Sequence, residues 1–145
     1  MAVDIADGLL ACSVVAGRDR YWICQTLLDG GLAVHAPGIL NLYSGQLGVA
    51  LTLGTAAAVL DRGDYADAAL QAVATIRRWS DGGRRGFTSC GVFNGAMGYA
   101  YVLANLGAML HRRDLVDEAI AVASAVPHAV PGAGHHRRGA HRARR

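Results

Sequence analysis

The pattern of apolar and polar positions repeats along the chain at an offset of 50 residues. Residues 42–76 align with residues 92–126 without a gap, and ten of the 35 aligned positions are identical. The identical positions include two pairs of glycines and two pairs of aspartates: Gly45/Gly95, Gly48/Gly98, Asp64/Asp114 and Asp67/Asp117. A bias toward alanine does not place such pairs at one shared offset. The pattern therefore predicts two copies of one structural unit, which we expect to superpose.

Each copy predicts two antiparallel helices. The first spans about 48–60 and again about 98–110, and it is apolar nearly all round, which is typical of a helix buried on every side. The second begins at Asp64 and at Asp114, because either aspartate can cap the free backbone N–H groups of a helix start. Apolar residues then recur at helical spacing along one stripe, so we expect an outer helix that lies on the inner one.

The segments around these helices are short or irregular. Polar turns at 61–63 and 111–113 join the two helices of each copy, and a stretch rich in Gly and Arg at 80–91 connects the copies. Ahead of the first copy, residues 5–15 predict a helix, which Gly8 weakens by about 1 kcal/mol relative to alanine. Further along, two apolar runs flank a turn signal, which predicts a small β-hairpin: 21–28 and 32–35 around Asp29, Gly30 and Gly31.

The end of the chain, from Pro127 onward, has no periodicity and is rich in Arg, His, Gly and Pro. A disordered basic tail is the favoured interpretation, and a shifted reading frame through GC-rich DNA is the alternative. A tail that binds nucleic acid or metal is the least favoured. The sequence thus divides into a lead-in segment with a β-hairpin at 1–40, two helical-hairpin repeats at 41–127 and a disordered basic tail at 128–145.

Composition and charge narrow the class of protein. Of the 145 residues, 52% are hydrophobic and 17% charged, which excludes disorder over most of the length. The net charge of +3 depends on five arginines after residue 128; without them, nine arginines face eleven acidic residues. The body is therefore slightly acidic and has no electrostatic footprint for nucleic acid.

The sequence also favours a cytoplasmic protein. Its first residues are acidic, whereas a secretory signal begins with positive charge before an apolar run. The longest nearly apolar runs, about 47–60 and 96–110, are shorter than the roughly 20 residues that cross a bilayer, so no membrane partner is expected. Three scattered cysteines, Cys12, Cys24 and Cys90, are too few for a disulfide framework.

The motifs of the two copies carry a family resemblance. The first copy contains an LY-x-G-x-x-G pattern followed by a Gly-Asp-Tyr turn: Leu42, Tyr43, Gly45, Gly48 and then 63–65. The glycine spacing recurs at 91–103, and a predicted hairpin with Trp22 precedes both copies. Over roughly 21–126 the chain resembles the opening part of the lanthionine synthetase C-like domain, in particular the cyclase half of class II lanthipeptide synthetases. We expect the glycines to shape the helical hairpins and to take no part in chemistry.

This resemblance implies an all-α fold, an α/α toroid of inner and outer helices that holds zinc at the centre of one face. In that family the zinc binds a cysteine thiolate of a precursor peptide, which adds to a dehydrated Ser or Thr to close a thioether ring. The family's ligands are two Cys and a His, with one Cys directly before the His, and this sequence has no Cys-His pair. We therefore assign no catalytic, cofactor-binding or metal-ligating residue. We expect an incomplete toroid, a fragment of the cyclase domain that is inactive alone and holds no zinc.

Other polar and aromatic residues have structural interpretations that we favour. Cys24 and Cys90 are expected to be buried as small apolar residues. Four aromatic residues flank the inner helices, and we expect core packing, with a peptide groove as the alternative: Tyr43, Phe93, Tyr99 and Tyr101. Arg84 and Arg85 indicate a solvated turn, with a site for an acidic leader peptide as the alternative. Asn105 is expected to be a satisfied buried amide.

Two other functions compete with a cyclase fragment. A toroid enzyme that acts on carbohydrates needs two carboxylates facing one site, whereas the acids here lie at the starts of the outer helices: Asp64, Asp67, Asp114, Asp117 and Glu118. A helical-repeat module that binds a peptide without catalysis is the second competitor. Its open architecture suits the apolar inner helices less well than an enclosed one.

An incomplete ring has a consequence for solubility. We expect apolar side chains of the second inner helix to remain uncovered: Leu103, Leu106, Met109 and Leu110. Exposed apolar area of this kind drives association. The isolated chain is therefore predicted to be poorly soluble or to self-associate through its inner helices.

Overall fold

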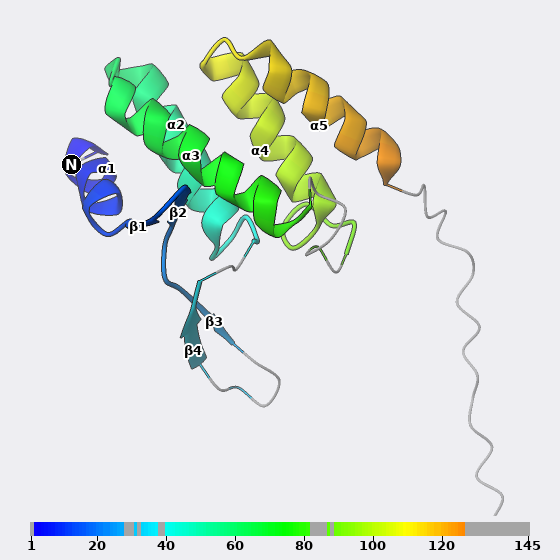
Figure 1. Cartoon of the computed structure of the whole chain (residues 1–145), viewed down its shortest axis with the longest axis horizontal. Coiled ribbons are helices and arrows are strands. Elements are labelled where there is room, and N and C mark those ends of the chain that lie inside the picture. The colour runs from blue at the N-terminus through cyan, green and yellow to red at the C-terminus, as the bar shows by residue number, and fades with distance from the viewer. Residues whose placement is uncertain are drawn as a thin grey trace, which may run out of the picture.

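The computed structural model describes residues 2–27, 31, 33–37, 40–81, 87 and 89–126, and these form a mostly helical fold with two small antiparallel sheets (Figure 1). The helices are α1 (Ala2–Ala11), α2 (Gln46–Leu60), α3 (Gly63–Trp79), α4 (Ala96–Met109) and α5 (Arg113–Ala125). The strands are β1 (Val14–Ala16), β2 (Asp19–Tyr21), β3 (Cys24–Leu27) and β4 (Ala33–Ala36). The predicted tail at 128–145 lies outside the described residues.

The two predicted helical hairpins are present as α2–α3 and α4–α5. The inner helices α2 and α4 pack against each other, and each outer helix lies on the inner helix of its own hairpin. Figure 1 shows α2 partly behind α3, and α4 lying between α3 and α5. Inner and outer helices begin at positions 50 residues apart, so the prediction from the ungapped repeat is confirmed at the level of secondary structure.

The turns within the two hairpins have the same backbone path. Asp61 and His111, which are repeat equivalents, both have a positive φ, 53° and 55°. Directly after them, the N–H of Arg62 donates to the Ala57 carbonyl at 3.1 Å and that of Arg112 donates to the Gly107 carbonyl at 2.8 Å. The prediction of short turns at these positions is therefore confirmed, and the repeat extends to backbone hydrogen bonds.

The predicted capping of the outer helices by aspartate is wrong. The helices α3 and α5 begin one residue earlier than expected, and the capping residues are Arg62 and Arg112, whose side chains make no capping hydrogen bond. Asp64 and Asp114 lie within the first turn, where each carboxylate accepts two hydrogen bonds from the arginine two residues before it. These hydrogen bonds hold the pKa of both carboxyl groups below the ordinary range. The negative charge still suits the helix start, as predicted from the dipole.

The lead-in segment contains more structure than the sequence predicts. The hairpin of β3 and β4 is confirmed, with Cys24 paired to Ala36, and the residues of its turn at 28–30 and 32 lie outside the described residues. A second hairpin, β1–β2, was not predicted; it turns at Gly17, whose φ of 61° suits glycine, and it includes Tyr21. Because residues 14–16 pair with this hairpin, α1 ends at Ala11 instead of residue 15.

The inner helices are not buried on every side, which corrects the sequence interpretation. One face of each is exposed, and it carries Thr52, Thr55, Ala58 and Val59 on α2 and Tyr101, Ala104 and Ala108 on α4. The residues expected to be uncovered are covered instead: Leu103 and Leu106 are fully buried, and Met109 and Leu110 are half-buried. The reason is the close packing of the hairpins. A Cβ at Gly54 would lie 2.0 Å from Cδ2 of Leu106, so α2 itself covers this side of α4.

Candidate functional site

The N-terminal ends of α2 and α4 lie next to each other and form the candidate site. Both helices begin directly after a glycine, Gly45 or Gly95, and the N–H of Leu42 donates to the Phe93 carbonyl at 2.8 Å, which joins the two entry loops. Chain segments from both repeats therefore meet at one end of the inner helices. The repeated glycine motif of this chain lies at this end, so the site was located by the sequence motif and not by any single reactive residue.

Two glycines of the motif are required by close backbone approach. A Cβ at Gly48 would lie 2.3 Å from the Leu42 carbonyl oxygen, and one at Gly98 would lie 2.1 Å from the Val92 carbonyl oxygen. The two contacts are repeat equivalents, six residues apart in each copy. Since both involve backbone oxygens, which cannot rotate away as a side chain can, the glycines set the shape of the entry loops, as predicted.

Aromatic side chains are exposed at this end of the inner helices. Tyr43 and Phe93, which are repeat equivalents, are 87% and 64% exposed, and Tyr101 on α4 is 48% exposed. Of the four aromatic residues predicted to flank the inner helices, Tyr99 is the one in the core, where it stacks on Phe87 with ring centroids 5.6 Å apart. The prediction of core packing is thus confirmed for Tyr99 and wrong for the other three. Exposed aromatic rings of this kind suit contacts with an extended peptide.

A buried amide anchors the lead-in segment to the start of α2. Gln46 is 1% exposed, and its side chain accepts from the Trp22 backbone N–H at 3.0 Å and donates to the Trp22 carbonyl at 2.5 Å. The indole N–H of Trp22 donates to the Leu9 carbonyl at 2.6 Å, so the same residue also holds α1. Sequence reasoning identified Trp22 as part of the lead-in but missed Gln46. The signal that could have identified Gln46 was its polar side chain at the start of a mostly apolar helix.

The three cysteines are free, and they differ in exposure. Cys24 is buried next to Gln46, and burial raises the pKa of its thiol, which disfavours the thiolate that a nucleophile or a zinc ligand needs. Cys90 is exposed in the loop before α4, so its predicted burial is wrong; the tight turn around Ser89 and Gly91 places its side chain outside. Among the described residues no three His, Cys, Asp or Glu side chains come together as a metal site would require.

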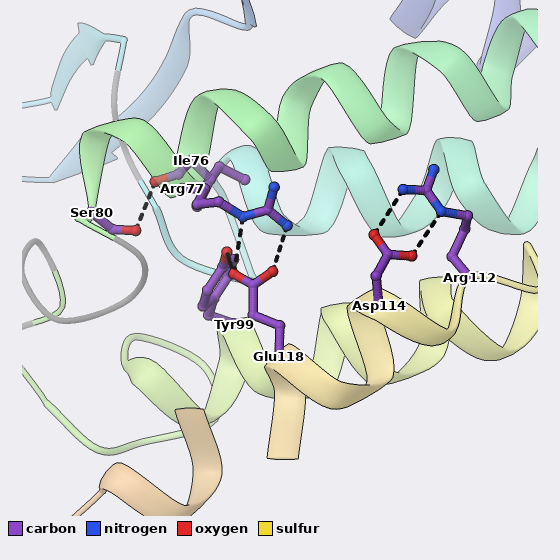
Figure 2. Close-up of polar contacts among 7 residues, drawn as sticks. All are labelled: Ile76, Arg77, Ser80, Tyr99, Arg112, Asp114 and Glu118. Atoms are coloured by element: carbon purple, nitrogen blue, oxygen red, sulfur yellow. Dashed lines mark hydrogen bonds and ion pairs between the residues drawn. The ribbon is translucent and has the colours of Figure 1, made fainter. Parts of the chain in front are cut away.

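An extended polar cluster joins α3, α4 and α5 (Figure 2). The Tyr99 hydroxyl on α4 donates to Glu118 Oε1 on α5 at 2.7 Å, and the Arg77 guanidinium on α3 donates to both carboxylate oxygens of Glu118. Burial, followed by the hydrogen bond to Glu118, raises the pKa of Tyr99, while the hydrogen bond to Glu118 raises the pKa of Arg77. The Glu118 carboxylate accepts hydrogen bonds from both hairpins and so holds them together. This geometry does not indicate a proton-transfer role.

Asp7 and Asp64 both pair with Arg62, whereas Asp19, Asp114 and Asp117 each pair with a separate arginine. Figure 2 shows Asp114 paired with Arg112 on the outer helix, away from the Glu118 cluster, and Ser80 donating to the Ile76 carbonyl within α3. Asp64 has the equivalent pairing with Arg62. The two carboxylates that a carbohydrate hydrolase needs are therefore absent from the paired acids of the described outer helices. Asn105 is only half-buried, so its predicted burial is not borne out, although its amide N–H donates to the Tyr101 carbonyl at 2.7 Å. Arg84 and Arg85 lie outside the described residues.

The Tyr99 hydroxyl gives a direct test of the cluster. The Tyr99→Phe variant is expected to lose about 1 kcal/mol of unfolding free energy, because one buried hydrogen bond to a charged acceptor is lost while Arg77 still pairs with Glu118. The phenol of Tyr99 has its ordinary pKa of about 10 in the unfolded chain and a higher pKa in the folded protein. The stability that this hydroxyl contributes is therefore present below about pH 10 and is lost as the pH rises further. Urea unfolding followed by circular dichroism measures both effects. Tyr101→Phe, at a half-exposed hydroxyl, is the matched control, and an equal loss in both variants would contradict a specific bond.

Comparison with known protein families identifies the family to which these residues belong. A family profile described as "Lanthionine synthetase C-like protein" matches residues 37–126, the two hairpins together with their entry loop. This covers well over half of the chain. No curated protein matches the sequence. Within the described part of the chain, no helix has both the length and the apolar character needed to cross a bilayer.

Proposed function

Because the chain belongs to the lanthionine synthetase C-like family, we propose that it forms the first part of the cyclase domain of a class II lanthipeptide synthetase. The reaction of such a domain adds a peptide cysteine thiolate to a dehydrated Ser or Thr. The observation that carries the proposal is that the family match coincides with the two coupled hairpins α2–α3 and α4–α5. The equivalent glycine contacts at Gly48 and Gly98 support a fold that adds hairpins around a ring.

In this proposal the two hairpins are a segment of an α/α toroid. The inner helices α2 and α4 lie side by side with the same direction, since Leu42 meets Phe93 at one end and Thr55 Oγ1 lies 3.8 Å from Met109 Sδ toward the other. Further hairpins added at the same spacing would continue the inner wall from α4. The exposed flank of α4 at Tyr101 and Ala104 is the place where the next inner helix would lie.

The contribution of this segment is shape and peptide contact. Zinc, when bound in the complete domain, would stabilise the peptide thiolate. The described residues of this chain do not fit zinc: Cys24 is buried with its sulfur 3.6 Å from the Gln46 amide, and Cys12 and Cys90 are exposed at separate places. The residues that suit a peptide are the exposed aromatics at the ends of the inner helices, Tyr43 and Phe93.

The test is complementation. The chain alone, supplied with zinc and a dehydrated precursor peptide, is expected to close no thioether ring and to purify without stoichiometric zinc. Mixed with a family cyclase domain that lacks its first two hairpins but keeps its zinc ligands, the chain is expected to restore ring formation. Mass spectrometry after thiol alkylation counts the rings, and metal analysis measures the zinc.

The controls separate the outcomes of this experiment. The shortened domain alone sets the background, and an intact family cyclase shows that the peptide is a competent substrate. Ring formation by the chain alone, or zinc that is lost on Cys24→Ala, would overturn the assignment of no chemistry to this segment. A chain that binds the linear peptide but restores no activity would instead favour a non-catalytic peptide-binding module, the function that the exposed Tyr43, Phe93 and Tyr101 favour as second candidate.

A further inference from the structure

An apolar groove of about 530 Å³ runs between α1 and α2. Ile5 forms one wall, and Thr52, Ala56 and Val59 form the other. Both large apolar side chains stand in solvent, since Ile5 is 56% exposed and Val59 is 75% exposed. The Thr52 hydroxyl donates to the Gly48 carbonyl of its own helix at 2.9 Å. The groove therefore presents an apolar surface, and its occupant must be apolar as well.

The repeat shows what kind of surface fits this groove. Three groove residues of α2 have equivalents on α4 at the offset of 50: Thr52/Val102, Ala56/Leu106 and Val59/Met109. On α4, two of these equivalents contact α2, because Leu106 packs against Gly54 and Met109 Sδ lies 3.8 Å from Thr55 Oγ1. The α2 residues that line the groove thus correspond, in the repeat, to the α4 residues that face α2.

The matching surface is also present and uncovered. On α2, α4 contacts Gly54 and also Thr55, which lines the groove as well; the equivalents of these two residues on α4 are Ala104 and Asn105. Gly54 is buried beneath Leu106, whereas Ala104 is exposed. We define the Ala104 face as the exposed side of α4 made by Tyr101, Ala104 and Ala108, which follow one another at helical spacing. The small side chains of Ala104 and Ala108 permit the close helix approach seen at Gly54.

We propose that a second copy of this chain docks the Ala104 face of its α4 into the α1–α2 groove of the first. The contact between two molecules would then resemble the contact between α2 and α4 within one molecule. The two surfaces differ, so the contact is head-to-tail, and an open assembly keeps one free groove and one free Ala104 face until a ring closes. This inference rests on the repeat geometry alone and does not depend on the proposed cyclase chemistry.

The first experiment measures self-association of the full chain by sedimentation velocity over a wide range of concentrations. Wild type is expected to form species larger than the 15.1 kDa monomer as the concentration rises, and high salt is expected to leave them intact because the contact is apolar. Val59→Glu and Ala104→Glu are each expected to weaken association by at least about tenfold, since each places a charge in the buried contact. A monomeric wild type, or oligomers that salt dissociates, would overturn the proposal.

Matched controls isolate the two surfaces. Val15→Glu replaces a valine of similar exposure on β1, and Ala121→Glu replaces an exposed alanine on α5; both are expected to associate like wild type. Circular dichroism reports whether each variant keeps its helices. Thr52→Glu in the groove and Ala108→Glu on the Ala104 face replace any variant that fails to fold. Controls that dissociate as much as the test variants would count against these surfaces.

Mixing the two test variants decides the head-to-tail geometry. Val59→Glu keeps an intact Ala104 face, and Ala104→Glu keeps an intact groove, so only one productive contact remains in the mixture. Each variant alone is expected to be monomeric, and an equimolar mixture is expected to form a heterodimer and nothing larger. A mixture that stays monomeric would overturn the proposal, as would variants that associate alone as strongly as wild type.

Discussion

Replacing Gly98 with alanine is expected to lower the free energy of unfolding by about 3 kcal/mol. In an unobstructed helix the same change would stabilise the protein by about 0.5–1 kcal/mol, because alanine loses less backbone entropy than glycine. Here the added Cβ would lie 2.1 Å from the Val92 carbonyl oxygen and 3.1 Å from its carbon. The entry loop must move to make room, which also pulls on the hydrogen bond between Leu42 and Phe93 that joins the two loops. Urea unfolding monitored by circular dichroism gives the difference.

Gly8→Ala is the matched control for this prediction. Gly8 lies inside α1, and a Cβ built there meets no atom within 4 Å. This variant is therefore expected to gain about 0.5–1 kcal/mol, so the two substitutions should change stability in opposite directions. A Gly98→Ala protein as stable as wild type would mean that the loop at 89–95 yields at little cost and that close approach does not explain the glycine.

Replacing Gln46 with leucine is expected to lower the free energy of unfolding by about 2–4 kcal/mol. Leucine has a similar volume but cannot hydrogen-bond, so the N–H and C=O groups of Trp22 would be left without their partner in a buried place. Each unsatisfied buried group costs about 1–3 kcal/mol. Near-ultraviolet circular dichroism of the tryptophans reports whether the lead-in segment detaches, and urea unfolding gives the energy.

Two further variants make the Gln46 result interpretable. Gln46→Glu still accepts from the Trp22 N–H, but when ionised it cannot donate to the Trp22 carbonyl and places an unpaired charge in a buried position. A loss at least as large as that of Gln46→Leu is therefore expected at neutral pH. Gln25→Leu, at an exposed glutamine of β3, should leave stability almost unchanged. If Gln46→Leu behaved like Gln25→Leu, the buried amide would not anchor the lead-in segment.

The helical repeats could be predicted because they depend on local patterns that occur twice. Asp61 and His111 adopt the same turn although their side chains differ, since the spacing of the flanking apolar residues fixes both helices. The lead-in segment was less predictable. Nothing near Gly17 distinguishes a turn of the β1–β2 hairpin from a loop, and α1 ends early because of pairing with residues beyond it. The starts of α3 and α5 were misassigned by one residue, because Arg62 and Arg112, which precede these helices, form arginine–aspartate pairs that compete with capping.

At the candidate site, motif positions were predictable and exposure was not. Gly48 and Gly98 were identified from spacing, and the structure supplies the carbonyl contacts that explain them. Gln46 was missed because its partner Trp22 is 24 residues away, and no local pattern indicates such a contact. Whether Tyr43 or Phe93 is covered depends on what packs against the ends of the inner helices, so the apolar character of the residues alone could not decide their exposure.

The Tyr99–Glu118–Arg77 cluster has a consequence for how the chain unfolds. In a repeat protein, stability is roughly the sum of the intrinsic stability of each unit and the coupling between neighbours, and weak coupling lets terminal units fray independently. Here the coupling includes a charged network that crosses from α3 to α5, in addition to Leu106 seated against Gly54. Neither Val49 nor Ala68, the equivalents of Tyr99 and Glu118, can reproduce this network within the first repeat. Loss of α5 would therefore leave the Tyr99 hydroxyl and the Arg77 guanidinium without their shared partner, so we expect the two hairpins to unfold in a single cooperative step.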